Sequence, residues 1–130
     1  MKILGIGVDI INNNRIKNSL KKKKIINRIF SKKEIKMTKN LLDKKAYYSK
    51  RFAAKESFAK AIGTGFRDNL NFSDIEIYND LKGKPYYFKS KKIIDTIYKN
   101  FKTRKFDIFL SISDEKDHSI AFTILYKKIW

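Results

Sequence analysis

A chain of 130 residues, 42% of them hydrophobic and 14% aromatic, is suited to one domain with one core, which we place over residues 1–130. With no cysteine and one histidine, disulfides, thiolate metal sites and histidine-based zinc sites are excluded; any metal would bind carboxylate oxygens, which favours Mg²⁺. The net charge of +18 indicates either an anionic partner or the lysine-rich codon usage of an AT-rich genome, since arginine stands at only five positions.

The N-terminal half predicts one strand followed by helices. Residues 2–8 are apolar and contain two glycines, as in a buried strand, and Asp9 would end it. Residues 15–29 indicate a broken helix with a lysine-rich face. The Ser31–Glu34 segment has the pattern of a capping box and would start another helix. A longer helix is expected over residues 43–62.

The C-terminal half predicts strands, turns and one amphipathic helix. Strand-like patterns occur at residues 72–78, 86–88, 106–113 and 119–126. Residues 90–101 have apolar side chains at helical spacing. The resulting order, β-α-α-α-β-β-α-β-β, predicts an α+β fold with a mostly antiparallel sheet and the helices packed on one side.

We expect neither a membrane span nor a signal peptide in this chain. No apolar run approaches the roughly 18 residues of a membrane span. The apolar stretch at residues 1–9 contains two glycines and ends in an acid rather than in a small-residue cleavage site. We therefore expect a soluble, cytoplasmic protein without a membrane partner.

The most informative stretch runs from Arg51 to Gly65. Glu56 and Lys60 stand one helical turn apart in it, which suits a surface ion pair worth about 0.2–0.5 kcal/mol. The small apolar residues around them favour a second interpretation, in which Glu56 is partly buried and a metal ion is its partner. Asp9 is then either a cap at a strand end or a second metal ligand, brought beside Glu56 when the long helix packs on the first strand.

Gly63, Thr64 and Gly65 follow the long helix directly. Such a turn is more often a helix C-cap than a phosphate-binding loop, because the C-terminus of a helix has a negative partial charge. Phosphate binding there would need cations, and Lys60 and Arg51 are the nearest ones.

These segments, in this order, resemble the holo-[acyl-carrier-protein] synthases, the bacterial 4′-phosphopantetheinyl transferases. The similarity spans essentially the whole chain, and the first strand and the long helix together form a highly specific pattern. The matching segments are Gly5–Ile10 with Arg15, Phe30–Ser31 with Glu34, Arg51–Glu56 through Gly65, Ile75–Ile77 with Gly83–Pro85, and Leu110–Glu115 with Ala121.

The resemblance implies transfer of 4′-phosphopantetheine from coenzyme A to a serine of apo-acyl carrier protein, for fatty acid biosynthesis, with release of adenosine 3′,5′-bisphosphate. It implies Mg²⁺ as the cofactor, with Asp9 and Glu56 as its ligands, and catalytic roles for Glu56 and Lys60. Arg15 would contact the carrier protein, and the assembly would be a homotrimer with sites between subunits. Contacts to coenzyme A are implied for Arg51, Lys60, Gly63, Thr64, Gly65, Pro85, Ser113 and Asp114.

Asp114 departs from the commonest pattern of the family, in which many members have His, although one branch has Asp. The proton acceptor therefore stays open between Glu56 and a metal-bound water. The alternative function is a basic nucleic-acid-binding α+β domain without catalysis, although the scarce arginine and the lack of an RNA-binding signature count against it. A non-catalytic module that binds coenzyme A is a third hypothesis.

Overall fold

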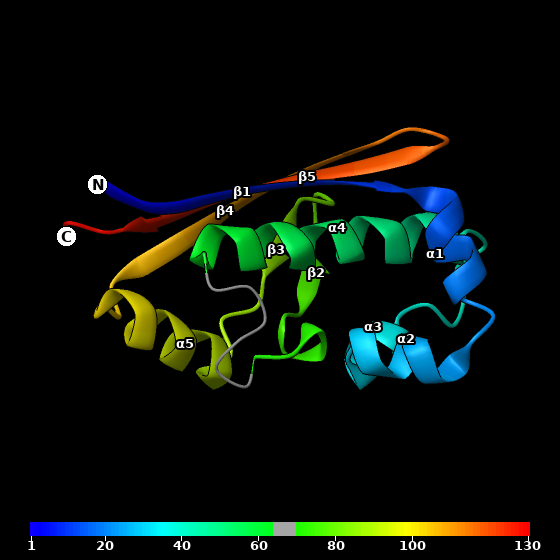
Figure 1. Cartoon of the computed structure of the whole chain (residues 1–130), viewed down its shortest axis with the longest axis horizontal. Coiled ribbons are helices and arrows are strands. Elements are labelled where there is room, and N and C mark those ends of the chain that lie inside the picture. The colour runs from blue at the N-terminus through cyan, green and yellow to red at the C-terminus, as the bar shows by residue number, and fades with distance from the viewer. Residues whose placement is uncertain (64–69) are drawn as a thin grey trace.

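The computed structural model describes residues 1–63 and 70–130 (Figure 1). In chain order the elements are β1 (Lys2–Asn12), α1 (Asn13–Ser19), α2 (Lys23–Ile29), α3 (Lys32–Lys36), α4 (Lys44–Ile62), a 3₁₀ turn (Phe72–Asp74), β2 (Ile77–Asn79), β3 (Pro85–Tyr87), α5 (Lys91–Phe101), β4 (Phe106–Asp114) and β5 (His118–Lys127). The predicted order is confirmed, with the broken helix of residues 15–29 present as the separate helices α1 and α2.

The main sheet is antiparallel and has the strand order β1-β5-β4. Helix α4 lies across one face of this sheet, and the helices lie on that same side of it (Figure 1). The opposite face has no element of the described chain upon it in this view. The α+β fold class with helices on one side is therefore confirmed.

The capping box at Ser31 is present. The Ser31 hydroxyl accepts from the Glu34 amide at 3.1 Å, and the Glu34 carboxylate accepts from the Ser31 amide at 3.1 Å. Helix α4 begins after Asp43, whose side chain accepts from the Ala46 amide at 3.0 Å. Local hydrogen bonds thus start α3 and α4 where the sequence predicts them.

Two predicted strand boundaries were wrong. β1 does not end at Asp9 but continues to Asn12, because Ile10 and Ile11 remain paired with β5. The expected strand at residues 72–78 starts instead as a 3₁₀ turn, because the Asp74 side chain accepts from the Asn71 amide at 2.8 Å and bends the chain. In each case a tertiary or local hydrogen bond overrides the alternation of side chains.

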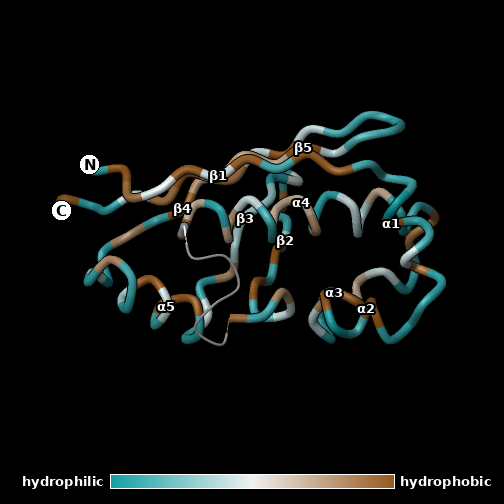
Figure 2. Tube along the Cα trace, in the orientation of Figure 1, coloured by the Kyte–Doolittle hydropathy of each residue, from teal (hydrophilic) through white to brown (hydrophobic). Residues whose placement is uncertain are grey.

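The core lies between α4 and the sheet and extends below the helix to α5 and the β2–β3 hairpin. Its members share nearly complete burial and include Ala53, Phe58, Ile75, Ile97 and Leu125. Figure 2 shows the same division, with hydrophobic colours along much of β1 and β5 and hydrophilic colours at the turn between β4 and β5. No helix among residues 1–63 and 70–130 is long and apolar enough to cross a bilayer.

Candidate functional site

Two glycines allow β1 to lie directly against α4. A Cβ atom on Gly5 would stand 1.8 Å from the carbonyl oxygen of Ala61, and one on Gly7 would stand 1.8 Å from that of Ser57. No side chain fits in that space, so the strand and the helix touch backbone to backbone. Asp9 follows Gly7 on the same face of β1, and it is therefore held close to the solvent-facing side of α4.

Asp9, Glu56 and Lys60 come together at this crossing. The Lys60 ammonium lies 3.0 Å from Asp9 Oδ1 and donates to the Val8 carbonyl oxygen at 3.0 Å. Partial burial raises the pKa of the Glu56 carboxyl, and the negative charge of Asp9 raises it further, while Lys60 acts in the opposite direction. Among the described residues, the ion pair of Lys60 is with Asp9 and not with Glu56, so the predicted surface ion pair within α4 is wrong.

The two carboxylates, Asp9 and Glu56, fit a hard divalent cation. Two carboxylates stand close enough to raise the pKa of one of them, and a cation between them would relieve that repulsion. The part of the chain that the structure describes has no cluster of three or more metal-binding side chains. Two carboxylates leave other coordination positions for water or substrate oxygens, as is usual where Mg²⁺ binds phosphate groups.

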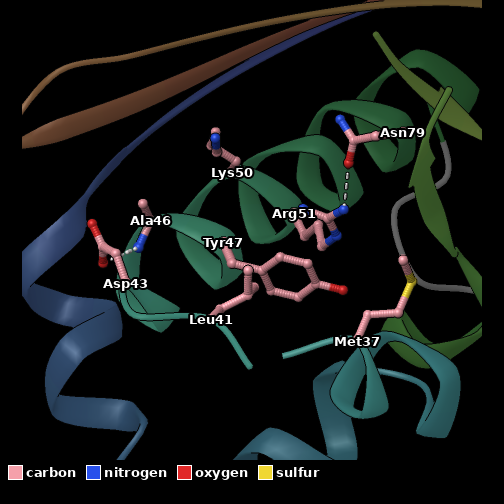
Figure 3. A pocket seen from close by; sticks show the side chains of 8 residues that line it. All are labelled: Met37, Leu41, Asp43, Ala46, Tyr47, Lys50, Arg51 and Asn79. Carbon is pink, nitrogen blue, oxygen red and sulfur yellow. Dashed lines mark hydrogen bonds between the residues drawn. The ribbon is translucent and has the colours of Figure 1, made fainter. Parts of the chain in front are cut away.

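Arg51 lies on another side of α4 and is almost fully buried. Its guanidinium carbon is 3.6 Å from the centroid of the Tyr47 ring, and one nitrogen donates to Asn79 Oδ1 at 2.7 Å (Figure 3). Its Nε atom is buried without a hydrogen-bond partner among the described residues. Burial lowers the pKa of Arg51, so a negatively charged ligand beside it would be stabilising.

Two hollows adjoin Arg51. The larger, of about 450 Å³, is the one in Figure 3 and is lined by Met37, Leu41, Asp43, Ala46, Tyr47, Lys50, Arg51 and Asn79. The smaller, of about 140 Å³, is lined by Lys50, Arg51, Ile77, Asn79, Gly83, Pro85, Ile112 and Asp114. The structure therefore brings together three of the residues that were predicted to contact coenzyme A: Arg51, Pro85 and Asp114.

The remaining predicted contacts lie elsewhere. Ser113 lines a different hollow, of about 280 Å³, together with Ile10 and His118, and Asp114 lines this hollow as well. Gly63 is the C-cap of α4, with φ of 86° and its amide donating to the Ala59 carbonyl oxygen at 3.1 Å, which is the capping role that such a glycine commonly has. Thr64 and Gly65 lie outside the described residues.

Arg15 lies on α1 at the edge of a fourth hollow. This hollow, of about 160 Å³, is lined by Ile11, Asn12, Arg15, Ile16, Ser19, Ile29 and Phe52. Phe52 is one helical turn before Glu56 on α4. A partner bound against Arg15 would thus also lie close to the carboxylates.

The sequence prediction missed a buried ion pair beside this site. Lys55 is fully buried, and its ammonium lies 2.7 Å from Glu34 Oε1 and 2.8 Å from the Phe72 carbonyl oxygen, and also donates to that of Ile75. The sequence does contain a sign that Lys55 is buried, because Lys55 falls on the apolar stripe of α4 between Tyr48 and Phe58. This pair joins α3, α4 and the segment before β2.

Comparison with known proteins places the chain in a family. Residues 5–123 match the family model of the 4′-phosphopantetheinyl transferase superfamily. A holo-[acyl-carrier-protein] synthase of Pelagibacter ubique (strain HTCC1062) is 58% identical over 128 residues, covering 98% of this chain and 100% of the relative. One of Ehrlichia chaffeensis (strain ATCC CRL-10679 / Arkansas) is 44% identical over 132 residues, covering 98% and 99%.

Solved structures agree with the sequence comparison. The holo-[acyl-carrier-protein] synthase of Neisseria meningitidis has a TM-score of 0.86 at 35% identity, covering 96% of this chain and 99% of that one. The Bacillus anthracis synthase, solved in complex with CoA (3′,5′-ADP), has a TM-score of 0.81 at 35% identity, covering 98% and 100%. The chain therefore belongs to the holo-[acyl-carrier-protein] synthases of the 4′-phosphopantetheinyl transferase superfamily.

Proposed function

We propose that this chain transfers 4′-phosphopantetheine from coenzyme A to a serine of apo-acyl carrier protein, for fatty acid biosynthesis, and releases adenosine 3′,5′-bisphosphate. The observation that supports it most is the meeting of Asp9, Glu56 and Lys60 where β1 crosses α4. Family membership over residues 5–123 favours this transferase activity over a nucleic-acid-binding function or a non-catalytic module.

Asp9 and Glu56 are the residues that would hold Mg²⁺. The bound ion would neutralise charge on the pyrophosphate of coenzyme A and orient it. Protonation competes with this binding, so the Glu56 carboxyl, whose pKa is raised, must lose its proton before the site can form. Both side chains are only partly covered, so a large ligand can reach them.

The reaction forms a bond between the serine oxygen and the β-phosphorus and breaks the bond from that phosphorus to the bridging oxygen. Lys60 is about half exposed and can turn from Asp9 to donate to the departing phosphate. The serine proton goes to the Glu56 carboxylate or to a water beside it, since this carboxylate is the basic group adjacent to Asp9. Arg15 and the hollow beside Phe52 would receive the carrier protein, whose acidic surface is complementary to the charge of +18.

The residues proposed to bind coenzyme A form two groups within one chain, one around Asp9 and the other around Asp114. Asp9 lies on β1 and Asp114 on β4, which are the two outer strands of the sheet, with β5 between them. We infer that one coenzyme A molecule contacts Asp9, Glu56 and Lys60 of one subunit and Arg51, Pro85 and Asp114 of a neighbour. The site would then be complete only in the assembled homotrimer.

The outer face of the sheet is the surface that would pair the subunits. Cross-strand pairs on this face include Val8 with Phe122 and Ile10 with Ile120. Its apolar side chains are 40% to 62% exposed in the single chain, namely Ile6, Val8, Ile10, Phe109, Ile120 and Phe122. A contiguous apolar face of this kind is unusual on a monomer, and a second copy of the chain would cover it.

Mixing of two inactive variants tests the shared site. Glu56→Gln and Arg51→Ala each remove one group, and subunits that exchange would form some sites with neither change. About a quarter of the sites in an equal mixture would be intact, so transfer should return to about that fraction of the wild-type rate. Native mass spectrometry verifies that the subunits have exchanged. If the transfer rate of the mixture is then no higher than that of either variant alone, a site between subunits is contradicted.

A further inference from the structure

Three hydroxyl groups meet in the interior where α4, β3 and β5 converge. Ser57 Oγ lies 2.6 Å from Thr123 Oγ1, and Tyr87 OH lies 2.7 Å from the same Thr123 atom and 3.3 Å from Ser57 Oγ. Ser57 and Thr123 are completely buried, and Tyr87 is 5% exposed. We call these three side chains the hydroxyl cluster.

All three hydroxyl hydrogens of the cluster have an acceptor inside the protein. Tyr87 donates to the Ala54 carbonyl oxygen at 2.7 Å, and Ser57 donates to the same oxygen at 3.0 Å. The Thr123 hydroxyl is then free to donate to either of its two partners. The set is closed without water, and in a buried environment such fully satisfied networks hold their members rigidly.

The hydroxyl cluster lies directly beneath the crossing of β1 and α4. Thr123 is the residue opposite Gly7 in the pairing of β1 with β5. Gly7 in turn is the residue whose absent side chain lets β1 touch the Ser57 carbonyl oxygen. The cluster is therefore one residue from Glu56 along α4 and next to the stretch of β1 that leads from Gly7 to Asp9.

At Gly5 and Gly7, β1 contributes no side chain that could set the geometry of this crossing. Interdigitated side chains normally fix how a helix sits on a sheet, and here the strand contributes Gly5 and Gly7, which have none. Backbone-to-backbone contact limits how closely β1 approaches α4, and the position of β1 along the helix therefore depends on β5, the strand to which it is paired. Hydrogen bonds, which are directional, supply the missing constraint.

We propose that the Ser57–Tyr87–Thr123 hydroxyl cluster is a positioning device that sets the separation of Asp9 and Glu56, and with it the affinity of the two carboxylates for a divalent cation. This inference rests on the proposed function. The three residues touch neither substrate nor metal; they act through α4 and through the β5 strand to which β1 is paired.

Thr123→Val is the variant that tests the proposal, because valine has the shape of threonine without the hydroxyl. Ser57 and Tyr87 keep their bonds to Ala54, but both lose their link to β5. With coenzyme A present, the dissociation constant of Mn²⁺, measured from the electron paramagnetic resonance signal of the free ion, should rise roughly tenfold, the lower end of the effect of losing a direct hydrogen-bond partner of a metal ligand. Thr123→Ser should restore the wild-type value.

Thr96→Val is the matched control. Thr96 is also a buried threonine, and its hydroxyl donates to the Lys92 carbonyl oxygen at 2.7 Å inside α5, away from the carboxylates. This variant loses a similar hydrogen bond, so its melting temperature should fall while its Mn²⁺ affinity stays at the wild-type value. Tyr87→Phe gives a second test, with a smaller rise because the bond between Ser57 and Thr123 remains.

The outcomes separate this inference from the proposed function. A weaker Mn²⁺ affinity and a lower kcat in Thr123→Val, with an unchanged KM for the carrier protein, would support the positioning role. Equal Mn²⁺ affinities in wild type, Thr123→Val, Tyr87→Phe and Thr96→Val would overturn it while leaving the transferase activity standing. A wild-type protein that binds no Mn²⁺ and modifies no carrier protein would overturn both.

Discussion

Replacing Gly7 by alanine perturbs the contact on which the candidate metal site depends. The new Cβ would stand 1.8 Å from the Ser57 carbonyl oxygen, and real Cβ atoms essentially never come closer than 3.0 Å to another heavy atom. The neighbouring atom is backbone, so it cannot swing away, and β1 must move from α4 by roughly 1 Å or more. Misplacement of a reacting group by about 1 Å can lower a rate about a hundredfold. We therefore expect Gly7→Ala to reduce kcat by about a hundredfold.

The assay is the rate of carrier-protein modification, followed by mass spectrometry well below the melting temperature. Ile93→Ala is a suitable control, because Ile93 is buried in α5 and the truncation should cost about 2–5 kcal/mol of stability. The control should keep its kcat at a temperature where it is folded. If folded Gly7→Ala works at the wild-type rate, the close packing of β1 on α4 does not position the carboxylates, and the reasoning is refuted.

Three further predictions concern single side chains. Glu56→Gln should nearly abolish transfer. Because burial and Asp9 raise the pKa of Glu56, the stability that its protonated form contributes is lost as pH rises through that pKa. In the absence of metal and near pH 7, Glu56→Gln should therefore melt at a higher temperature than the wild type, and a lower melting temperature would argue against this environment. Arg15→Glu should raise the KM for the carrier protein more than that for coenzyme A in steady-state assays, and an equal effect on both would argue against docking. Lys55→Met should lose about 3–5 kcal/mol in urea unfolding, since Glu34 stays buried without its cation, and a loss below about 1 kcal/mol would show that the pair is not buried in solution.

Much of the fold could be predicted because its signals are local. The capping box at Ser31 and Glu34, the hydrophobic spacing of α5 and the alternation in β4 and β5 depend on residues within a few positions of one another. The end of β1 could not be predicted, since Ile10 and Ile11 stay in the strand only through pairing with residues more than a hundred positions away. Strand pairing is a tertiary property, so the period of the side chains does not determine where it stops.

The candidate site, too, could be predicted only in part. Asp9, Glu56 and Lys60 could be chosen from the sequence as a set, since the residue types suit a metal and a phosphate. The ion-pair partner of Lys60 could not be predicted from the sequence, because helical spacing favours Glu56. Only the packing of β1 on α4 brings Asp9 Oδ1 to 3.0 Å from the Lys60 ammonium.

The groups that support the site were harder to foresee. Lys55 looks like a surface residue of a lysine-rich chain until its place on the apolar side of α4 is considered. The hydroxyl cluster joins three elements that lie far apart in the sequence, so no local pattern indicates it.

One measurement tests the proposed activity most directly. The purified chain is incubated with coenzyme A, Mg²⁺ and apo-acyl carrier protein, and the carrier protein is then weighed by intact-mass spectrometry. The account predicts that the carrier gains the mass of one phosphopantetheine, that adenosine 3′,5′-bisphosphate appears in equal amount, and that chelation of Mg²⁺ stops both. A folded protein that leaves the carrier at its original mass in the presence of coenzyme A and Mg²⁺ would contradict it.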